Sequence, residues 1–144
     1  MVLEDARDLA RAFSATVHLV HVVDDLAHRR PHVSPAELGE MQSTIETRAH
    51  EKLDGLLDQE LRSTGAHAVV LTSVRPALAI LAYARDASIA LIVIGTHSHR
   101  GFADWFMGSV AQEIVRAAEC PVLAIRHAQR QPQHEAAPAT SVSG

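Results

Sequence analysis

The stretch from residue 89 to residue 126 constrains the fold of this chain more than any other. It begins with six apolar residues, Ile89 to Ile94, whose isoleucine- and valine-rich composition is typical of a strand buried on both faces. A loop follows, then an apolar pattern with the period of a helix from Val110, then a second apolar run from Cys120 to Ile125. This order predicts two parallel strands joined by a right-handed crossover through a helix.

The loop of this unit carries residue types that suit an anion site. Gly95 lets the backbone turn sharply after the strand, and Ser109, which follows Gly108, is a candidate N-cap for the helix. A helix N-terminus presents free N–H groups and the positive end of the helix dipole, both of which favour a phosphate. Glycines at such places also serve simply as turns, so the spacing alone leaves both interpretations open.

The rest of the chain alternates helices and strands. Before the central unit we expect a helix over 1–13, a strand over 16–23, a polar loop over 24–33, a helix over 34–63, a strand over 67–73 and a helix over 76–84. Ser34, Pro35 and Glu37 form a helix-start pattern, and Gly65 follows the expected end of that long helix. The alternation predicts a doubly wound α/β fold with a mostly parallel sheet.

Composition limits the classes of partner. The chain has 13 basic and 17 acidic residues among 144, so it has no basic surplus for binding nucleic acid. A single cysteine is compatible with the cytoplasm, and no apolar run is long enough to cross a membrane. We expect one cytoplasmic domain over residues 1–126 and a disordered tail over 127–144, which is rich in Gln, Pro, Ala and Ser.

Patterns for metal binding and catalysis are sparse in the sequence. His18 and His21 lie three apart on an expected strand and therefore point to opposite faces, and no Cys/His cluster has ligand spacing. We expect no protein-held metal. No nucleophile elbow or Walker loop is present, so we expect no catalytic residues.

The loop resembles the nucleotide-binding signature of the universal stress protein family. That signature is a glycine, two residues, a second glycine, nine residues, then Gly-Ser or Gly-Thr. Here Gly95, Ser98, Gly108 and Ser109 have this spacing, with Ser98 in place of the second glycine. The flanking segments 91–97 and 120–126 are also similar to the family, and the resemblance extends over about residues 1–126.

The resemblance implies a site for an adenine nucleotide: ATP, ADP or AMP. A magnesium ion bound to its phosphates stays open. Since the sequence has no Walker lysine, we expect any ATP hydrolysis to be slow or absent. The resemblance implies that backbone N–H groups near Gly95, Gly108 and Val110 approach the phosphates, that Ser98 lies among them, and that Ser109 donates its hydroxyl. Ile94 would contact the base or ribose, and Val22 and Val23 would flank the adenine. Arg100, beside the loop, adds a positive charge that suits phosphates.

The resemblance also implies an element that this sequence does not show. In the family, a central strand with a nucleotide-binding aspartate precedes the first helix, whereas Met1 here aligns with that helix. We therefore expect one of three arrangements: a natural chain that starts upstream, direct pairing of strands 16–23 and 90–95, or a partner strand in the slot. An upstream start is our preferred expectation.

Three functions follow as hypotheses. The leading one is a regulatory stress-response protein that binds an adenine nucleotide and forms a homodimer through the edge strand Pro121 to Arg126, as the family does. The second is a nucleotide-free dimeric interaction module. The third, from fold analogy alone, is an enzyme acting on an adenylated substrate.

Overall fold

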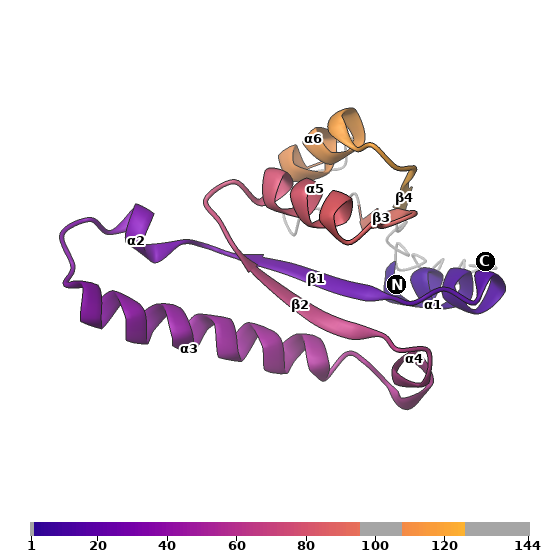
Figure 1. Cartoon of the computed structure of the whole chain (residues 1–144), viewed down its shortest axis with the longest axis horizontal. Coiled ribbons are helices and arrows are strands. Elements are labelled where there is room, and N and C mark those ends of the chain that lie inside the picture. The colour runs from indigo at the N-terminus through magenta and orange to yellow at the C-terminus, as the bar shows by residue number, and fades with distance from the viewer. Residues whose placement is uncertain (1, 96–107, 126–144) are drawn as a thin grey trace, which may run out of the picture.

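The computed structural model describes residues 2–95 and 108–125 of the chain, and its elements alternate as expected (Figure 1). The elements in chain order are α1 (Val2–Phe13), β1 (His18–Val23), α2 (Leu26–Arg29), α3 (Pro35–Asp54), α4 (Gln59–Ser63), β2 (His67–Thr72), α5 (Pro76–Asp86), β3 (Ile92–Gly95), α6 (Ser109–Ala117) and β4 (Val122–Ile125).

All strand pairing in the described residues is parallel, which confirms the α/β fold class. β1 pairs with β2 in a register that joins His18 to His67, and β3 pairs with β4 in a register that joins Ile92 to Val122. Helices connect each strand to its partner, as a parallel pair requires.

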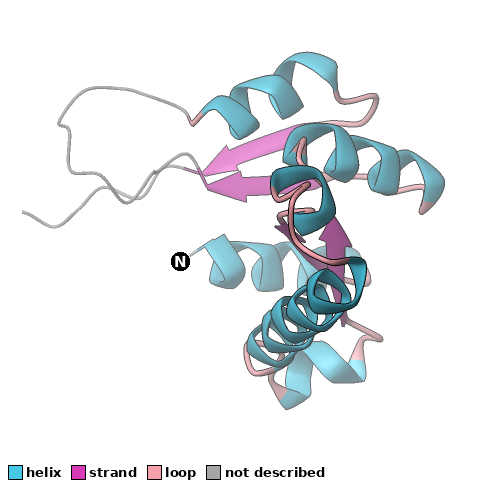
Figure 2. Ribbon diagram, turned by 90° about the vertical axis from the view of Figure 1, so that its left-hand side faces the viewer, coloured by secondary structure: helices cyan, strands magenta, loops and turns pink. Residues whose placement is uncertain are grey.

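The four strands form two separate two-stranded sheets and not one continuous sheet. The two strand pairs also differ in direction. β1 and β2 run across the view in Figure 1, whereas β3 and β4 run across the view in Figure 2, which is turned by 90°. Direct pairing of β1 with β3, one of the three expected arrangements, is not what the structure shows. Instead α1 contacts β3, and α5 contacts β1.

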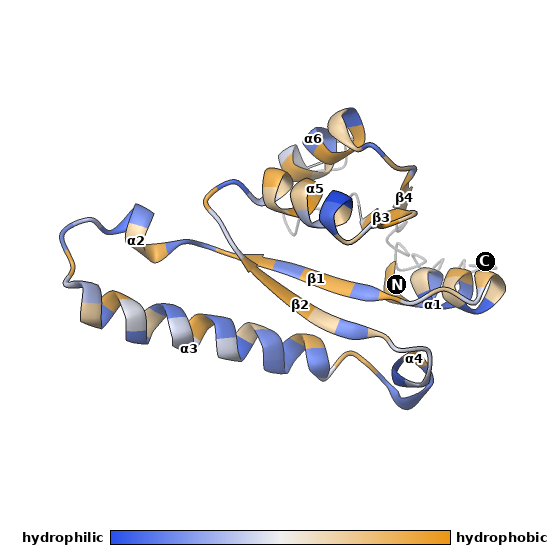
Figure 3. Ribbon diagram, in the orientation of Figure 1, coloured by the Kyte–Doolittle hydropathy of each residue, from blue (hydrophilic) through white to orange (hydrophobic). Residues whose placement is uncertain are grey.

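Each sheet has its own small hydrophobic cluster. The first cluster contains the buried residues Ala77, Ala84, Ile92 and Ile114 from α5, β3 and α6. The second contains Leu57, Leu61 and Ala66 at the α4 end of the β1–β2 sheet. Figure 3 shows apolar stretches on both strand pairs and on the helices that cover them. The fold therefore consists of two α/β halves, each with one parallel strand pair and its own hydrophobic cluster.

The expected single helix over 34–63 is wrong, because the structure breaks it at Gly55. α3 begins as predicted, with Ser34 accepting from the Glu37 amide, but it ends at Asp54 with Gly55 as its C-cap. Asp58 then starts α4 by accepting a hydrogen bond from the Leu61 amide at 3.0 Å. Because a second helix begins here, Leu57 and Leu61 pack in one cluster with Ala66.

Other boundaries differ from the sequence prediction for local reasons. The expected polar loop contains the short helix α2, which Asp25 caps and Leu26 anchors by burial. β1 begins at His18 and not at residue 16. β3 begins at Ile92 because Ser88 has a φ of 51° and the Ile89 amide donates to Ala84 O at 2.8 Å. Residues 89–91 therefore complete the turn after α5.

Candidate functional site

The two ends of the predicted anion loop lie on the same side of the molecule. Figure 2 shows the end of β3, the start of α6 and the N-terminus of α1 together on that side. Gly95 closes β3, and Gly108, Ser109 and Val110 form the first turn of α6. The structure thus brings together four of the sequence-predicted residues around the ends of one loop.

The start of α6 lacks a side-chain cap, which corrects one sequence expectation. Gly108 is the N-cap residue and Ser109 is the first helical residue, so Ser109 does not cap the helix. Asp25, Ser34 and Asp58 cap α2, α3 and α4 with side-chain oxygens, whereas α5, which begins with Pro76, also lacks a side-chain cap. Gly108 has no side chain, so the N-cap residue of α6 leaves the backbone donors of the first turn without a side-chain acceptor of its own.

The two glycines of the loop have different surroundings. A Cβ built on Gly108 would meet no heavy atom within 4 Å, and its backbone φ of −56° suits any L residue. A Cβ on Gly95 would lie 3.0 Å from the Val2 Cγ2 of α1. The space beside Gly108 is open among the described residues, whereas a side chain of α1 lies against Gly95.

The residues predicted to contact the nucleotide base do not lie along one edge of a sheet. Val23 is buried with 6% exposure at the end of β1, and Val22 and Ile94 are half-buried. Because β1 and β3 run in different directions, their carboxyl ends do not line up along one edge (Figures 1 and 2). Ser98, Arg100 and the expected tail over 127–144 lie outside the described residues.

Sequence reasoning missed a polar cluster between the halves, which we call the His18 cluster: His18, His67 and Tyr83. His18 Nδ1 lies 2.6 Å from the Tyr83 hydroxyl oxygen, and the two imidazole centroids are 4.2 Å apart. Burial lowers the pKa of His18 below its ordinary value, and His67 lowers it further. Burial also raises the pKa of Tyr83. His18 and His67 are 49 positions apart in the sequence, and the register of β1 with β2 is what makes them neighbours.

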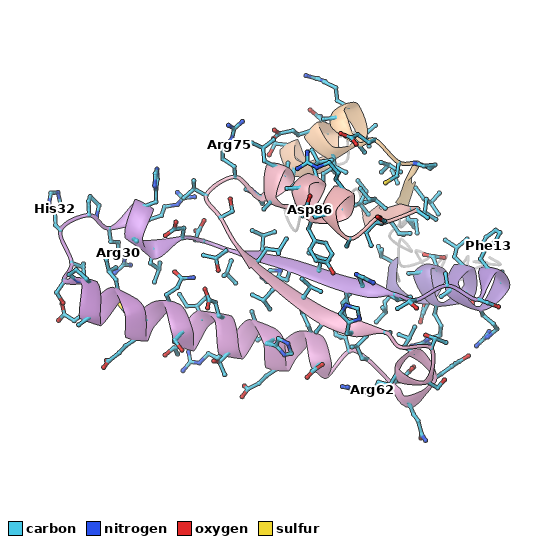
Figure 4. All side chains as sticks on the ribbon, in the orientation of Figure 1. Phe13, Arg30, His32, Arg62, Arg75 and Asp86 are labelled. Atoms are coloured by element: carbon cyan, nitrogen blue, oxygen red, sulfur yellow. The ribbon has the colours of Figure 1, made fainter. Side chains whose placement is uncertain are left out.

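The electrostatics around α5 and α6 are those of an exposed surface. Figure 4 shows Arg75 at the start of α5, and its guanidinium lies 3.9 Å from the Glu113 carboxylate of α6. From the expected polar loop, His32 extends outward beyond the N-terminal end of α3 in the same view, and Arg30, which follows α2, is also exposed. Within residues 2–95 and 108–125, no group of three or more His, Cys, Asp or Glu has the geometry of a metal site.

Cys120 lies half-buried before β4 and lines a cavity of about 500 Å³ between α5, α6 and β3. The apolar run that begins at Cys120 predicts a buried small residue there, whereas the structure leaves Cys120 half-buried. Within the same described ranges, no helix is long and apolar enough to span a membrane.

Comparison with known proteins decides the family. The model of the universal stress protein family matches residues 2–126. The chain belongs to the universal stress protein family. Universal stress protein A homolog 1 of Coxiella burnetii is 32% identical over 127 residues, which cover 86% of this chain and 85% of that protein. A universal stress protein of Methanocaldococcus jannaschii is 29% identical, with 88% of this chain and 74% of that protein covered.

Solved universal stress protein structures share the fold. UspA from Lactobacillus plantarum superposes with a TM-score of 0.68 at 24% identity, covering 87% of each chain. A family member from Burkholderia pseudomallei has a TM-score of 0.58 at 26% identity, covering 86% of this chain and 83% of that one. The sequence-based recognition of the family and its α/β fold is thus confirmed, and membership supports a role in the stress response.

Proposed function

We propose that this universal stress protein binds an adenine nucleotide with its phosphates at the start of α6. One observation carries the proposal: α6 has Gly108 as its N-cap residue and therefore no side-chain cap. α5 also lacks one, but it begins at Pro76, which has no backbone N–H, whereas α6 begins at Ser109, which has one. Uncapped backbone donors at the positive end of a helix favour an anion such as a phosphate.

The residues around this helix start support the same assignment. Ser109 is exposed in the first turn, where its hydroxyl can donate to a phosphate oxygen. Val110 is half-buried and adds the next backbone N–H. No described residue lies within 4 Å of a Cβ built on Gly108, which leaves room on that side for close approach of a phosphate. Gly95, Ser98 and Arg100 complete the phosphate side of the proposed site by their places in the family signature.

We assign the base side to Ile94, Val22 and Val23, as the resemblance implies. Since β1 and β3 run in different directions, the structure supports mainly the phosphate side of the proposal. A magnesium ion would bind to the nucleotide phosphates. We propose binding without turnover, because no base and orienting acid accompany Ser109 in the sequence.

Calorimetry of the full chain with ATP, ADP and AMP in the presence of Mg²⁺ tests the proposal. The informative variant is Gly108→Ala, because its Cβ meets no atom of the described residues within 4 Å but would crowd a phosphate held by the backbone. Gly39→Ala is the matched control, since Gly39 also has open space around its Cβ but lies in α3. We expect Gly108→Ala to lose about tenfold or more in affinity, and Gly39→Ala to bind normally.

Equal affinity in both variants would contradict the phosphate assignment. Absence of heat with all three nucleotides, in a chain with native circular dichroism, would contradict nucleotide binding itself. Turnover of labelled ATP above a buffer control would contradict the proposed lack of catalysis.

A second candidate function is a nucleotide-free dimeric interaction module. The position of Val2 favours it, because its Cγ2 lies 3.0 Å from the place of a Cβ on Gly95, so a side chain of α1 fills space beside this glycine. Val2→Ala separates the two functions. If Val2 obstructs a working site, this variant binds nucleotide more tightly than the wild type. If the module is nucleotide-free, Val2→Ala leaves binding absent.

We further propose that the protein is a cytoplasmic homodimer that acts in the stress response through binding. β4 pairs with β3 on one side only among the described residues, and Leu123 on it is 39% exposed. An apolar strand with an open edge is a ready surface for pairing with a second copy. We propose no nucleic-acid partner, given the net charge of −4, and no membrane partner.

A further inference from the structure

The His18 cluster has a feature that the nucleotide proposal does not use. His18 and His67 are register partners on adjacent strands, so their side chains lie on the same face of the β1–β2 sheet. Tyr83 reaches this face from α5, and the two imidazole centroids are 4.2 Å apart with ring planes tilted by 54°. Two imidazoles are thus held as neighbours across one strand pair.

Hydrogen bonding fixes which nitrogen of His67 is available. Its Nδ1 lies 3.2 Å from the carbonyl oxygen of Gly65, and a carbonyl oxygen can only accept. In the neutral imidazole the proton therefore lies on Nδ1, and Nε2 carries the lone pair. A metal-binding histidine commonly donates its second ring N–H to such a carbonyl, which fixes both tautomer and orientation.

Tyr83 can play the same part for His18. Its hydroxyl oxygen can accept from Nδ1–H as well as donate to Nδ1, so the 2.6 Å contact is compatible with either tautomer. When the phenol oxygen accepts, Nε2 of His18 carries the lone pair. Both histidines then have Nδ1 held by an oxygen and Nε2 available as a ligand.

The geometry points to a two-histidine site for a divalent transition-metal ion at His18 and His67, with Tyr83 as a positioning residue. With metal–nitrogen bonds of about 2.0 Å, two imidazoles bound through Nε2 would have centroids about 4.5 Å apart at the right angle of a square-planar ion and about 5.2 Å apart at the tetrahedral angle of zinc. From the observed 4.2 Å, the rings must therefore move apart slightly for Cu²⁺ or Ni²⁺ and by about 1 Å for Zn²⁺. His67 is exposed, so an ion and its waters can reach the pair.

The ligand chemistry selects the class of ion. Imidazole nitrogen suits Zn²⁺, Ni²⁺ and Cu²⁺, whereas Mg²⁺ and Ca²⁺ prefer oxygen ligands. With two protein ligands and water at the remaining positions, the site binds less tightly than a four-ligand structural zinc site. The order of affinity follows the usual series, with Cu²⁺ bound more tightly than Ni²⁺ or Zn²⁺.

Imidazole-resolved ¹H–¹⁵N NMR of the full chain titrated with ZnCl₂ tests this site. A site-specific readout is needed because the chain has 10 histidines. We expect the Nε2 signals of His18 and His67 to shift together and saturate at one ion per chain, while their Nδ1 stays protonated. The His21 signals should not move, because His21 lies on the opposite face of β1 by strand alternation.

Matched variants complete the test. His67→Gln changes an exposed residue and should abolish the shift of His18, whereas His21→Gln should leave it intact. Tyr83→Phe should keep the shift but weaken zinc affinity about tenfold, because the orienting partner is lost. Unchanged His18 and His67 signals at millimolar zinc in the wild type would overturn the site. So would an unaltered His18 shift in a His67→Gln chain with native circular dichroism.

Discussion

The Nδ1 atom of His18 on β1 lies 2.6 Å from the hydroxyl oxygen of Tyr83 on α5, in a half-buried position. This hydrogen bond joins the β1–β2 half of the molecule to the half built from α5, β3, α6 and β4. Since the two strand pairs do not hydrogen-bond to each other, such side-chain contacts help to fix how the halves meet.

Tyr83→Phe should therefore destabilise the fold by about 0.5–1.5 kcal/mol, the usual net contribution of one hydrogen bond. Urea unfolding followed by circular dichroism measures this loss. Thr16→Val is a control, because the Thr16 hydroxyl donates to Thr64 O at 3.2 Å in an exposed position and should matter less. Equal loss in both variants would show that the His18–Tyr83 contact has no special role.

Asp58 has two roles that substitutions can separate. Its Oδ1 accepts from the Leu61 amide at 3.0 Å, and its Oδ2 lies 2.6 Å from the Arg7 guanidinium of α1. Asp58→Asn keeps the cap and removes the ion pair, so we expect a loss of about 0.2–1 kcal/mol. Asp58→Ala removes both and should cost about 1 kcal/mol more. Thermal unfolding of the two variants side by side measures the difference, and equal melting temperatures would contradict the capping role.

Two glycines should respond to alanine with opposite signs. Gly65 has a φ of +80°, which alanine adopts only with strain, so Gly65→Ala should destabilise by about 1–2 kcal/mol. Gly39 lies within α3 with open space around it, so Gly39→Ala should stabilise by up to about 1 kcal/mol. Chemical denaturation gives both values, and a stabilising Gly65→Ala would contradict the left-handed turn.

Sequence periodicity predicted the order of the main helices and strands because each has a clear apolar pattern. The Ser34 cap also followed from local chemistry, since Ser34 and Glu37 bond to each other within one turn. The parallel pairing followed from the strand–helix–strand order, and the family followed from the spacing of Gly95, Ser98, Gly108 and Ser109. Features within one element are the ones that a single sequence encodes most directly.

What the sequence could not predict depends on contacts between elements. The break at Gly55 places Leu57 and Leu61 against Ala66, and no local pattern reveals that packing. The exposure of Met41 and Ile45 on α3 was hidden for the same reason, because their periodic spacing resembles that of a buried stripe. At the candidate site, the contact of Val2 with Gly95 joins residues 93 positions apart in the sequence.

Leu123→Lys tests the proposed homodimer. Leu123 lies on the edge strand β4 with 39% exposure, and a lysine there would place like charges face to face across the pairing of two copies. We expect the variant to be monomeric by light scattering at concentrations where the wild type is dimeric. Val115→Lys on α6 is the control, because Val115 is 47% exposed but lies on a helix. A dimeric Leu123→Lys would place the interface elsewhere.

The two hydrophobic clusters should respond to mutation independently. Leu61 and Ile114 are each 1% exposed, but they lie in different clusters with no member in common. We expect Leu61→Ala to cost about 2–5 kcal/mol and Ile114→Val about 0.5–1.5 kcal/mol. In the double variant the losses should add to within about 0.5 kcal/mol, as they do for sites that share no partners. A double variant within one cluster is the matched comparison. Ile92 and Ile114 belong to the same cluster, so the losses of Ile92→Val and Ile114→Val should not add. Denaturant unfolding of the single and double variants measures both cycles. Strong coupling between Leu61 and Ile114 would show that the halves share one core, contrary to the separation of their clusters.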